Sequence, residues 1–512
     1  MLGFFSNKSD HPLANLKSAQ QLLDDLPKSD PVQVLDEIGH WIEALFDPEN
    51  AFRLDHQLAV LRMLDEAAHP YLRKIINSYF AVVAPATFQE NRYWAAMNGY
   101  YTFTESAYVQ LAKGLQDGEK GSSAIKPQTA LICARGIYAA YGKLECTAVK
   151  YAQIDPQLWA HLAAFYALAE TEHCQDEMIP LYAGMKVNVS VQHLLASVLM
   201  WYSVGVGAFK PLDLHIAKCL MIYMCQSFLV SDHAEADSQF VFDLDKTASP
   251  VRVTDGGAMY PASARFVNIG GAPQQLDNLI KTLAKNLVPE ELSFGVAYSA
   301  EMMTDVVRRL AGFCQSSSPM RRHPRRKINI GVNVLNGFFK VIEKTNTGLS
   351  IGDASSESWN VEDMSATGMR CVLPPGHGAG VKIGTLIGLQ PEKAEHWGVG
   401  VVRRLRRDEK NNLHIGVRIL ANKVMNVVVN DIEGGGADPE HTALLLDRTD
   451  EQGSESWMLM KADTFSINRS PTMKLGEQSY LLMPLALVEK GEDFDLVRYR
   501  KMAQDTGGDD AY

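Results

Sequence analysis

Apolar residues three and four positions apart dominate the chain from Pro31 to about Val230. The segments 32–46, 54–67 and 71–80 show this spacing clearly, and each places its apolar residues on one face of a helix. Proline and glycine residues interrupt the pattern at intervals that suit pairs of antiparallel helices. The spacing therefore predicts an α-helical interaction domain over residues 1–230.

One helical segment carries a more specific pattern. Trp159, Leu162, Ala163 and Tyr166 follow the W-x2-L-small-x2-Y spacing of the first helix of a tetratricopeptide repeat, although the remainder of that signature is absent. Two interpretations stay open. The region is either a tetratricopeptide-like helical array that binds a partner protein along a concave face, or a plain bundle whose aromatic residues form the core.

The pattern changes twice beyond residue 230. A strand-like run is followed by a stretch rich in glycine, proline and alanine and then by two amphipathic helices, so we expect a mixed α/β connector over 231–318. Alternation with period two then predicts strands over 319–430, a further small β unit over 431–505 and a disordered tail at 506–512. The predicted fold class is multidomain α + β.

Two polar clusters lie at the start of the strand-rich region. Arg321, Arg322, Arg325 and Arg326 crowd together after a run of serines and just before a strand, which suggests a flexible cationic arm entering a sheet. The second cluster is a D-x-S-x-x-G sequence formed by Asp363, Ser365 and Gly368. Residues two apart share one face of a strand, so its acid and hydroxyl can point toward one ligand while the glycine allows close approach.

An R-x-x-x-R cluster before a first strand, followed by D-x-S-x-x-G on the next pair, resembles the PilZ domain, a bacterial receptor module for cyclic di-GMP. The resemblance continues through 381–389 and 398–420 and covers residues 318 to 425. It implies an antiparallel six-stranded β-barrel and a cyclic di-GMP site.

Two details depart from the family pattern or leave it open. The gap between Arg325 and Asp363 is longer than is usual in PilZ domains, which implies an insertion around 344–358. Arg321 with Arg325 and Arg322 with Arg326 both fit the R-x-x-x-R spacing. The proline before Arg325 favours the first pair.

The residue types suit such a ligand on chemical grounds as well. Guanidinium groups donate paired hydrogen bonds to phosphate or to the guanine edge and stack on bases, and a carboxylate accepts from the guanine N1 and N2 donors. Each charge-assisted bond contributes about 1.5 to 3 kcal/mol, whereas ordering the arm costs about 1 to 2 kcal/mol per residue. A few good contacts therefore suffice to order the arm when the ligand binds. The opposing interpretation is a solvated basic linker beside a tight turn.

Composition narrows the functional classes. A net charge of -11 argues against long-range steering to a nucleic-acid polymer. Seven cysteines without C-x-x-C or metal-ligand spacing are expected to be reduced core residues of a cytoplasmic protein, and we expect no metal and no cofactor besides the ligand. The longest apolar stretch, 194–209, is too short for a bilayer span, and the first residues do not form a signal peptide.

Two further motifs carry alternative chemistry. Asp243, Asp245 and Thr247 resemble the nucleophile motif of haloacid-dehalogenase phosphatases, but the surrounding sequence predicts too few strands for the required Rossmann-like domain. A strand end followed by a polar turn is the favoured interpretation. A second group of arginines falls on a predicted hairpin and either extends the ligand surface or, as the favoured interpretation, forms a solvated face: Arg403, Arg404, Arg406 and Arg407.

The sequence therefore predicts a non-enzymatic cyclic di-GMP receptor. The resemblance implies that a protein partner of the helical half relays the signal to motility, surface attachment or exopolysaccharide control in a bacterium. The alternatives are a PilZ-like scaffold that binds no nucleotide and a phosphatase built on Asp243 and Asp245. The candidate ligand-binding residues are Arg321, Arg322, Arg325, Arg326, Asp363, Ser365 and Gly368.

Overall fold

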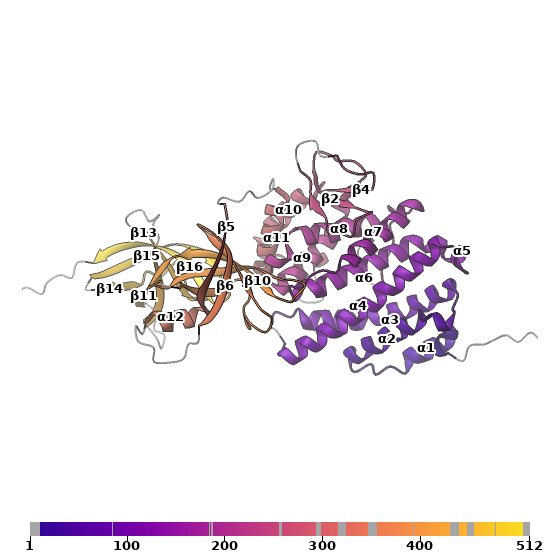
Figure 1. Ribbon diagram of the computed structural model, residues 1–512, viewed down its shortest axis with the longest axis horizontal. Coiled ribbons are helices and arrows are strands. Elements are labelled where there is room, and N and C mark those ends of the chain that lie inside the picture. Colours follow the sequence, from indigo (N-terminus) through magenta and orange to yellow (C-terminus); the bar gives the residue numbers. More distant parts are fainter. Residues whose placement is uncertain are drawn as a thin grey trace, which may run out of the picture. The chain divides into compact units, whose positions relative to one another are not determined.

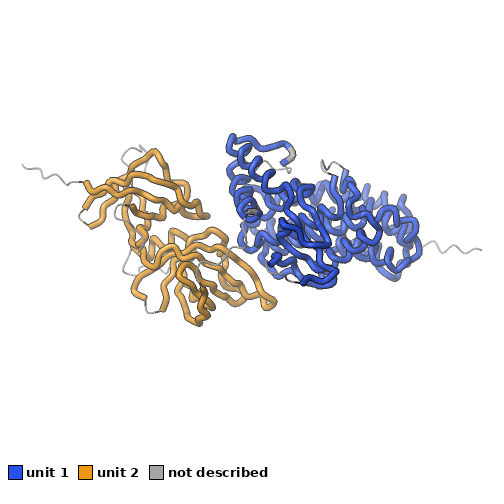
Figure 2. The backbone as a smooth tube through the Cα atoms, turned by 90° about the horizontal axis from the view of Figure 1, so that it is seen from above, with its two compact units in different colours: residues 1–319 blue, residues 320–512 orange. Residues whose placement is uncertain are grey.

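The chain folds into two units, Met1–Pro319 (unit 1) and Met320–Tyr512 (unit 2), which Figure 2 shows in separate colours. The computed structural model describes residues 11–83, 85–183, 185, 188–254, 259–292, 298–315, 324–346, 356–392, 394–430, 440–447, 455–476 and 478–504. Unit 1 is mainly helical and unit 2 is mainly antiparallel β structure, so the predicted fold class is confirmed.

Several helices of unit 1 begin where the sequence provides a cap. Asp30 accepts hydrogen bonds from the backbone N–H groups of the first turn of α2, and Asp155 does the same for α7. A proline occupies the first position of both helices, where its missing N–H costs nothing. The helices are α1 (Leu16–Asp24), α2 (Pro31–Leu45), α3 (Leu54–Tyr79), α4 (Thr87–Gln116), α5 (Ser122–Ile125), α6 (Thr129–Val149), α7 (Pro156–Thr171), α8 (Val191–Ser203), α9 (Pro211–Tyr223), α10 (Ala272–Leu283) and α11 (Ala300–Gln315).

Helix α6 is the centre of unit 1 and packs against α4, α7, α8 and α9 (Figure 1). Two glycines allow this close packing. A Cβ on Gly136 would lie 2.3 Å from the Phe165 ring of α7, and one on Gly142 would lie 2.2 Å from the Tyr101 ring of α4. Because α6 contacts α8 and α9 in addition to α4 and α7, its nearer neighbours in the chain, the packing favours the bundle interpretation over an open repeat array, in which each repeat contacts only the next.

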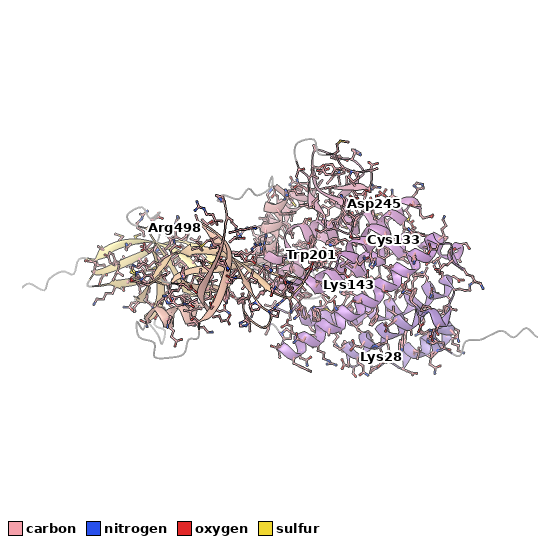
Figure 3. All side chains as sticks on the ribbon, in the orientation of Figure 1. Lys28, Cys133, Lys143, Trp201, Asp245 and Arg498 are labelled. Carbon is pink, nitrogen blue, oxygen red and sulfur yellow. The ribbon has the colours of Figure 1, made fainter. Side chains whose placement is uncertain are left out.

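The residues of the tetratricopeptide-like pattern lie in α7 and are buried, as both interpretations require. Figure 3 places Trp201 and Cys133 among the helices of unit 1, and both are fully buried. All seven cysteines are free thiols, and five of them are buried.

The expected α/β connector is part of unit 1. Its strands form one antiparallel sheet with the order β1-β4-β2-β3, and α8 packs against three of them. The core of the helical bundle continues through Phe240 and Phe242 into α10 and α11 without a break. The strands are β1 (Leu229–Ser231), β2 (Ser238–Asp243), β3 (Val251–Arg252) and β4 (Ala264–Asn268).

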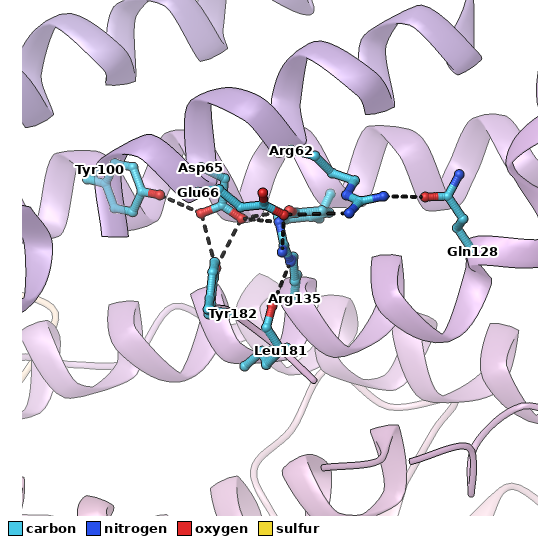
Figure 4. Close-up of polar contacts among 9 residues, drawn as sticks. Arg62, Asp65, Glu66, Tyr100, Gln128, Arg135, Leu181 and Tyr182 are labelled. Carbon is cyan, nitrogen blue, oxygen red and sulfur yellow. Dashed lines mark hydrogen bonds and ion pairs between the residues drawn. The ribbon is translucent and has the colours of Figure 1, made fainter. Parts of the chain in front are cut away.

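A buried ionic network ties α3, α4 and α6 together (Figure 4). The carboxylate of Asp65 accepts hydrogen bonds from the hydroxyls of Tyr100 at 2.5 Å, Tyr108 at 2.7 Å and Tyr182 at 3.0 Å. Arg135 donates to the same carboxylate at 3.3 Å and to Glu66 at 2.7 Å. This network satisfies a charge pair that would otherwise be costly to bury.

A second buried cluster joins α6 to α9. Glu145 accepts from His215 Nδ1 and from Lys218 Nζ, each at 2.8 Å. Burial raises the pKa of Glu145, but Lys218 and His215 outweigh it and lower that pKa to about 2. Burial lowers the pKa of His215, but Cys219 and Glu145 outweigh it and raise that pKa to about 10.

Unit 2 consists of two closed barrels. The first contains β5 (Arg326–Asn336), β6 (Glu357–Ser365), β7 (Gly368–Leu373), β8 (Leu386–Pro391), β9 (Gly398–Arg407) and β10 (Leu413–Ala421). The second contains β11 (Lys423–Asn430), β12 (Glu440–Asp447), β13 (Glu455–Lys461), β14 (Thr472–Leu475), β15 (Gln478–Lys490) and β16 (Phe494–Gln504).

Both barrels have the same circular strand order. The rings run β5-β6-β7-β10-β9-β8 and β11-β12-β13-β16-β15-β14, which is first, second, third, sixth, fifth, fourth in each case. The region expected to be a small β unit is therefore a complete second barrel. It begins at Lys423 rather than at residue 431, because β11 pairs with β12 and β14. Only Asn422 separates β10 from β11.

The two barrels share a hydrophobic core that includes the helix α12 (Phe338–Asn346), inserted between β5 and β6. Val341 of this helix packs in one cluster with Leu444 and Leu496 of the second barrel. Asp493 accepts hydrogen bonds from the backbone N–H groups of Phe338 and Leu386 at 2.6 and 2.9 Å. The insertion expected around 344–358 thus begins earlier, as a helix that holds the barrels together.

We expect Asp65→Ala to lower the free energy of unfolding of unit 1 by about 3 to 5 kcal/mol, because it leaves the buried Arg135 without its buried counter-charge. The control is Glu66→Ala. Glu66 contacts the same arginine but is 44% exposed, so its loss should cost less than about 1 kcal/mol. Urea unfolding followed by helical circular dichroism measures both, and equal losses would contradict the assignment.

The second cluster makes unit 1 sensitive to pH. His215 keeps its proton in the folded chain up to about pH 10 but loses it near 6.5 when unfolded, so its contribution is full below 6.5 and is lost as pH rises toward 10. The stabilisation of the folded state by Glu145 is fully present above pH 4.5 and is lost as the pH falls toward 2.

The urea concentration at the midpoint of unfolding, measured from the helical signal, should therefore decrease as the pH rises from 6.5 to 10. His215→Gln should flatten this alkaline decline, whereas His40→Gln, at an exposed position, should leave it unchanged. A decline of the same steepness in all three proteins would rule out His215 as its source.

Candidate ligand-binding site

The D-x-S-x-x-G residues form a tight hairpin between β6 and β7, in which Ser365 pairs with Gly368. A β-bulge lies one step further along the hairpin: Val361 pairs with Cys371 but Asp363 pairs with Arg370, so Glu362 is the extra residue. Val361 and Cys371 are buried in the barrel. The bulge therefore turns Asp363 and Ser365 to the outer face, where Arg370 is 46% exposed.

Asp363 lies between two arginines on this face. Arg325 Nη1 donates to Asp363 Oδ1 at 2.6 Å, and Arg370 Nε lies 3.1 Å from Asp363 Oδ2. Arg370 Nε is also 3.0 Å from Glu362 Oε2. The Asp363 side chain is only 12% exposed, so these cations compensate a largely buried charge.

Gly368 sits where three parts of the site meet. A Cβ added there would lie 2.9 Å from the carbonyl oxygen of Val417 on β10, 3.9 Å from Arg325 Nη2 and 4.0 Å from Ser365 Oγ. Ser365 Oγ donates to the carbonyl oxygen of Gly368 at 3.2 Å. Only glycine lets β10 approach this closely, and Arg325 and Ser365 both lie next to it.

The other predicted arginines are placed differently. Arg321 and Arg322 lie outside the described residues. Arg326 is exposed at the start of β5 opposite Met364, which alternates with Asp363 and Ser365 and so faces the other side of the sheet. Of Arg325 and Arg326, Arg325 is the one that joins the acid.

The thiol of Cys371 lies beneath the site and is inert. Burial raises its pKa to about 12, and the nearby carboxylates of Asp363 and Glu362 add to this effect. The thiol therefore stays protonated and acts as a packing group.

The hairpin arginines have separate environments. Arg403 pairs with Glu489 of the second barrel at 2.5 Å, and Arg407 donates to Asn411 within the β9–β10 hairpin. Arg404 and Arg406 are exposed and lie opposite Gly416 and His414 of β10.

The phosphatase motif does not have the expected surroundings. Asp243 ends a strand of an antiparallel sheet, where Ser263 donates to it at 2.7 Å and Lys246 pairs with it at 2.9 Å. A nucleophile of that family needs a parallel α/β sheet. The turn that contains Asp245 lines a cavity of about 380 Å³ together with alanines of α7.

The described residues contain no group of three or more His, Cys, Asp and Glu residues that could hold a metal ion. Among the same residues, no helix combines the length and apolar character that crossing a membrane requires.

Residues 17–223 match the family model described as "Cyclic-di-GMP receptor FimW, N-terminal domain". The matched stretch runs from the second residue of α1 to the last residue of α9, and thus lies wholly within unit 1. No curated protein matches the chain. The family match and the D-x-S-x-x-G hairpin therefore occupy different units.

Arg370 and Glu362 are site residues that were not predicted from the sequence. The pairing of Ser365 with Gly368 puts Arg370 beside Asp363, so a two-residue turn drawn on the sequence would have identified the arginine. Glu362 was missed because the only sign of the bulge is a shift of one residue in the alternation, from Val361 to Met364, which was not interpreted as an extra residue.

Gly368→Ala should destabilise the first barrel by about 1 to 3 kcal/mol, because the new methyl meets a backbone carbonyl that cannot move aside. The control is Gly331→Ala on β5, where the methyl would meet only the flexible end of Glu392. Scanning calorimetry of the full chain should show a lower transition temperature for the first variant alone.

Proposed function

We propose that this protein is a receptor for cyclic di-GMP and that the ligand binds on the outer face of the first barrel. The observation that carries the proposal is the meeting of Arg325, Asp363 and Ser365 around Gly368. The arm contributes a guanidinium, the hairpin contributes a carboxylate and a hydroxyl, and the glycine leaves bare backbone between them.

Each group has a chemical role toward a cyclic dinucleotide. The carboxylate of Asp363 accepts from guanine N1 and N2 donors, and the Ser365 hydroxyl can serve a phosphate or a base edge. Arg325 has further N–H groups for phosphate and a planar face for stacking. Without ligand, Arg325 is engaged by Asp363, so on binding Arg325 would exchange this carboxylate for a phosphate, while Asp363 would keep Arg370 and accept from the guanine donors.

The family match of unit 1 supports the same ligand class from a separate part of the chain. A model named for a cyclic di-GMP receptor matches a helical region that does not contain the hairpin. Two independent features therefore suggest one second messenger.

The proposal extends to the output of the receptor. Unit 1 would hold a protein partner, and ligand capture by the arm, which follows unit 1 directly in sequence, would alter that interaction. By the resemblance, the controlled process would be motility, surface attachment or exopolysaccharide production. No catalytic step is part of this proposal.

Arg325→Ala and Asp363→Ala should each weaken cyclic di-GMP binding by about 10- to 100-fold, because each removes a charge-assisted hydrogen bond. Isothermal titration calorimetry measures the loss, and circular dichroism verifies the fold. Arg407→Ala is the matched control, since it removes the same charge from the end of the β9–β10 hairpin.

Unchanged affinity in both site variants would refute the site. A wild-type protein that shows no heat with cyclic di-GMP would point to the scaffold function instead.

A further inference from the structure

A row of side chains crosses four strands on the outer face of the first barrel. Asp363 of β6 pairs with Arg370 of β7, Arg370 pairs with Gly416 of β10, and Gly416 pairs with Arg404 of β9. Directly paired residues of an antiparallel sheet point to the same face. At about 4.8 Å per strand, the row extends the site by roughly 14 Å from Asp363.

Two glycines in the middle of this face carry no side chain; Gly368 is buried and Gly416 is partly exposed. Gly416 is two residues from Arg418, which pairs with Gly368, so the two glycines are diagonal neighbours on β10 and β7. Arginines border both glycines. Arg325 and Arg418 lie beside Gly368, and Arg370 and Arg404 flank Gly416.

Three of these arginines are already engaged by carboxylates. Arg325 pairs with Asp363, Arg370 with Glu362 and Asp363, and Arg418 with Glu489 at 2.6 Å. The fourth, Arg404, differs from them. Within the part of the chain that the structure describes, its exposed side chain makes no ion pair or hydrogen bond.

We propose that Arg404 contacts the ligand directly and binds the second phosphodiester of the cyclic dinucleotide across the bare backbone of Gly416. This inference rests on the function proposed above and extends that site from two strands to four. Arg325 would bind the phosphodiester next to Gly368, and Arg404 would bind the second phosphodiester.

The geometry gives a physical reason for this division. A cyclic dinucleotide carries two negative charges on opposite sides of one ring, and a single arginine cannot pair with both. Arg404 needs no exchange of partners before it binds an anion, whereas Arg325, Arg370 and Arg418 do. A side chain at position 416 would fill the space between Arg370 and Arg404, because a Cβ there would already lie 3.1 Å from Arg404 Cβ.

The test compares Arg404→Ala with Arg407→Ala in the full chain by calorimetric titration with cyclic di-GMP. We expect Arg404→Ala to lose about tenfold or more in affinity and Arg407→Ala to match the wild type. Gly416→Leu, which changes no charge, should weaken binding to a similar extent by covering the floor of the site. Thermal unfolding confirms that each variant is folded.

The outcomes separate this inference from the proposed function. If the wild type binds, Arg325→Ala weakens binding and Arg404→Ala binds as the wild type does, the assignment of Arg404 is overturned while the receptor function stands. Equal losses of affinity in Arg404→Ala and Arg407→Ala would show that only the overall charge matters, and would also overturn the assignment of Arg404. A wild type that does not bind would overturn both.

Discussion

The candidate site depends on the placement of one carboxylate. Asp363 is largely removed from water, so it requires cationic partners, and it has them in Arg325 and Arg370. The bulge at Glu362 turns the carboxylate outward, and the missing side chain at Gly368 lets β10 and the arm approach it. In the free protein, Arg325 is thus already held against the hairpin by the carboxylate of Asp363.

Glu489 of the second barrel reaches the edge of this site. Glu489 of β15 pairs with Arg403 and with Arg418, and Arg418 is the strand partner of Gly368. A ligand that draws Arg418 toward a phosphate would have to compete with Glu489. The outer face of the first barrel is therefore linked to the neighbouring barrel by this ion-pair cluster, in addition to the apolar core that the two share.

Local periodicity accounts for the features that were predicted from the sequence. The helical and strand-rich regions follow from spacings of three to four and of two, and period two also places Asp363 and Ser365 on one face, as the structure shows. That these residues bind a ligand stays a prediction. The sequence could not show the closure of the second barrel, because β11 pairs with β14 more than forty positions later. It also could not show the central place of α6. The two glycines that allow its close packing have no special meaning in the sequence, because the Phe165 and Tyr101 rings that lie against them are brought there only by the fold.

The single residue between β10 and β11 has a mechanical consequence. Two domains joined by a long linker can move relative to each other. Here the linker is the single residue Asn422, and contacts of Asp493 and α12 with both barrels restrict the junction further. Unit 2 is thus best regarded as one stiff double cylinder, built by repeating a single winding pattern. A force on the first barrel would therefore displace both barrels together.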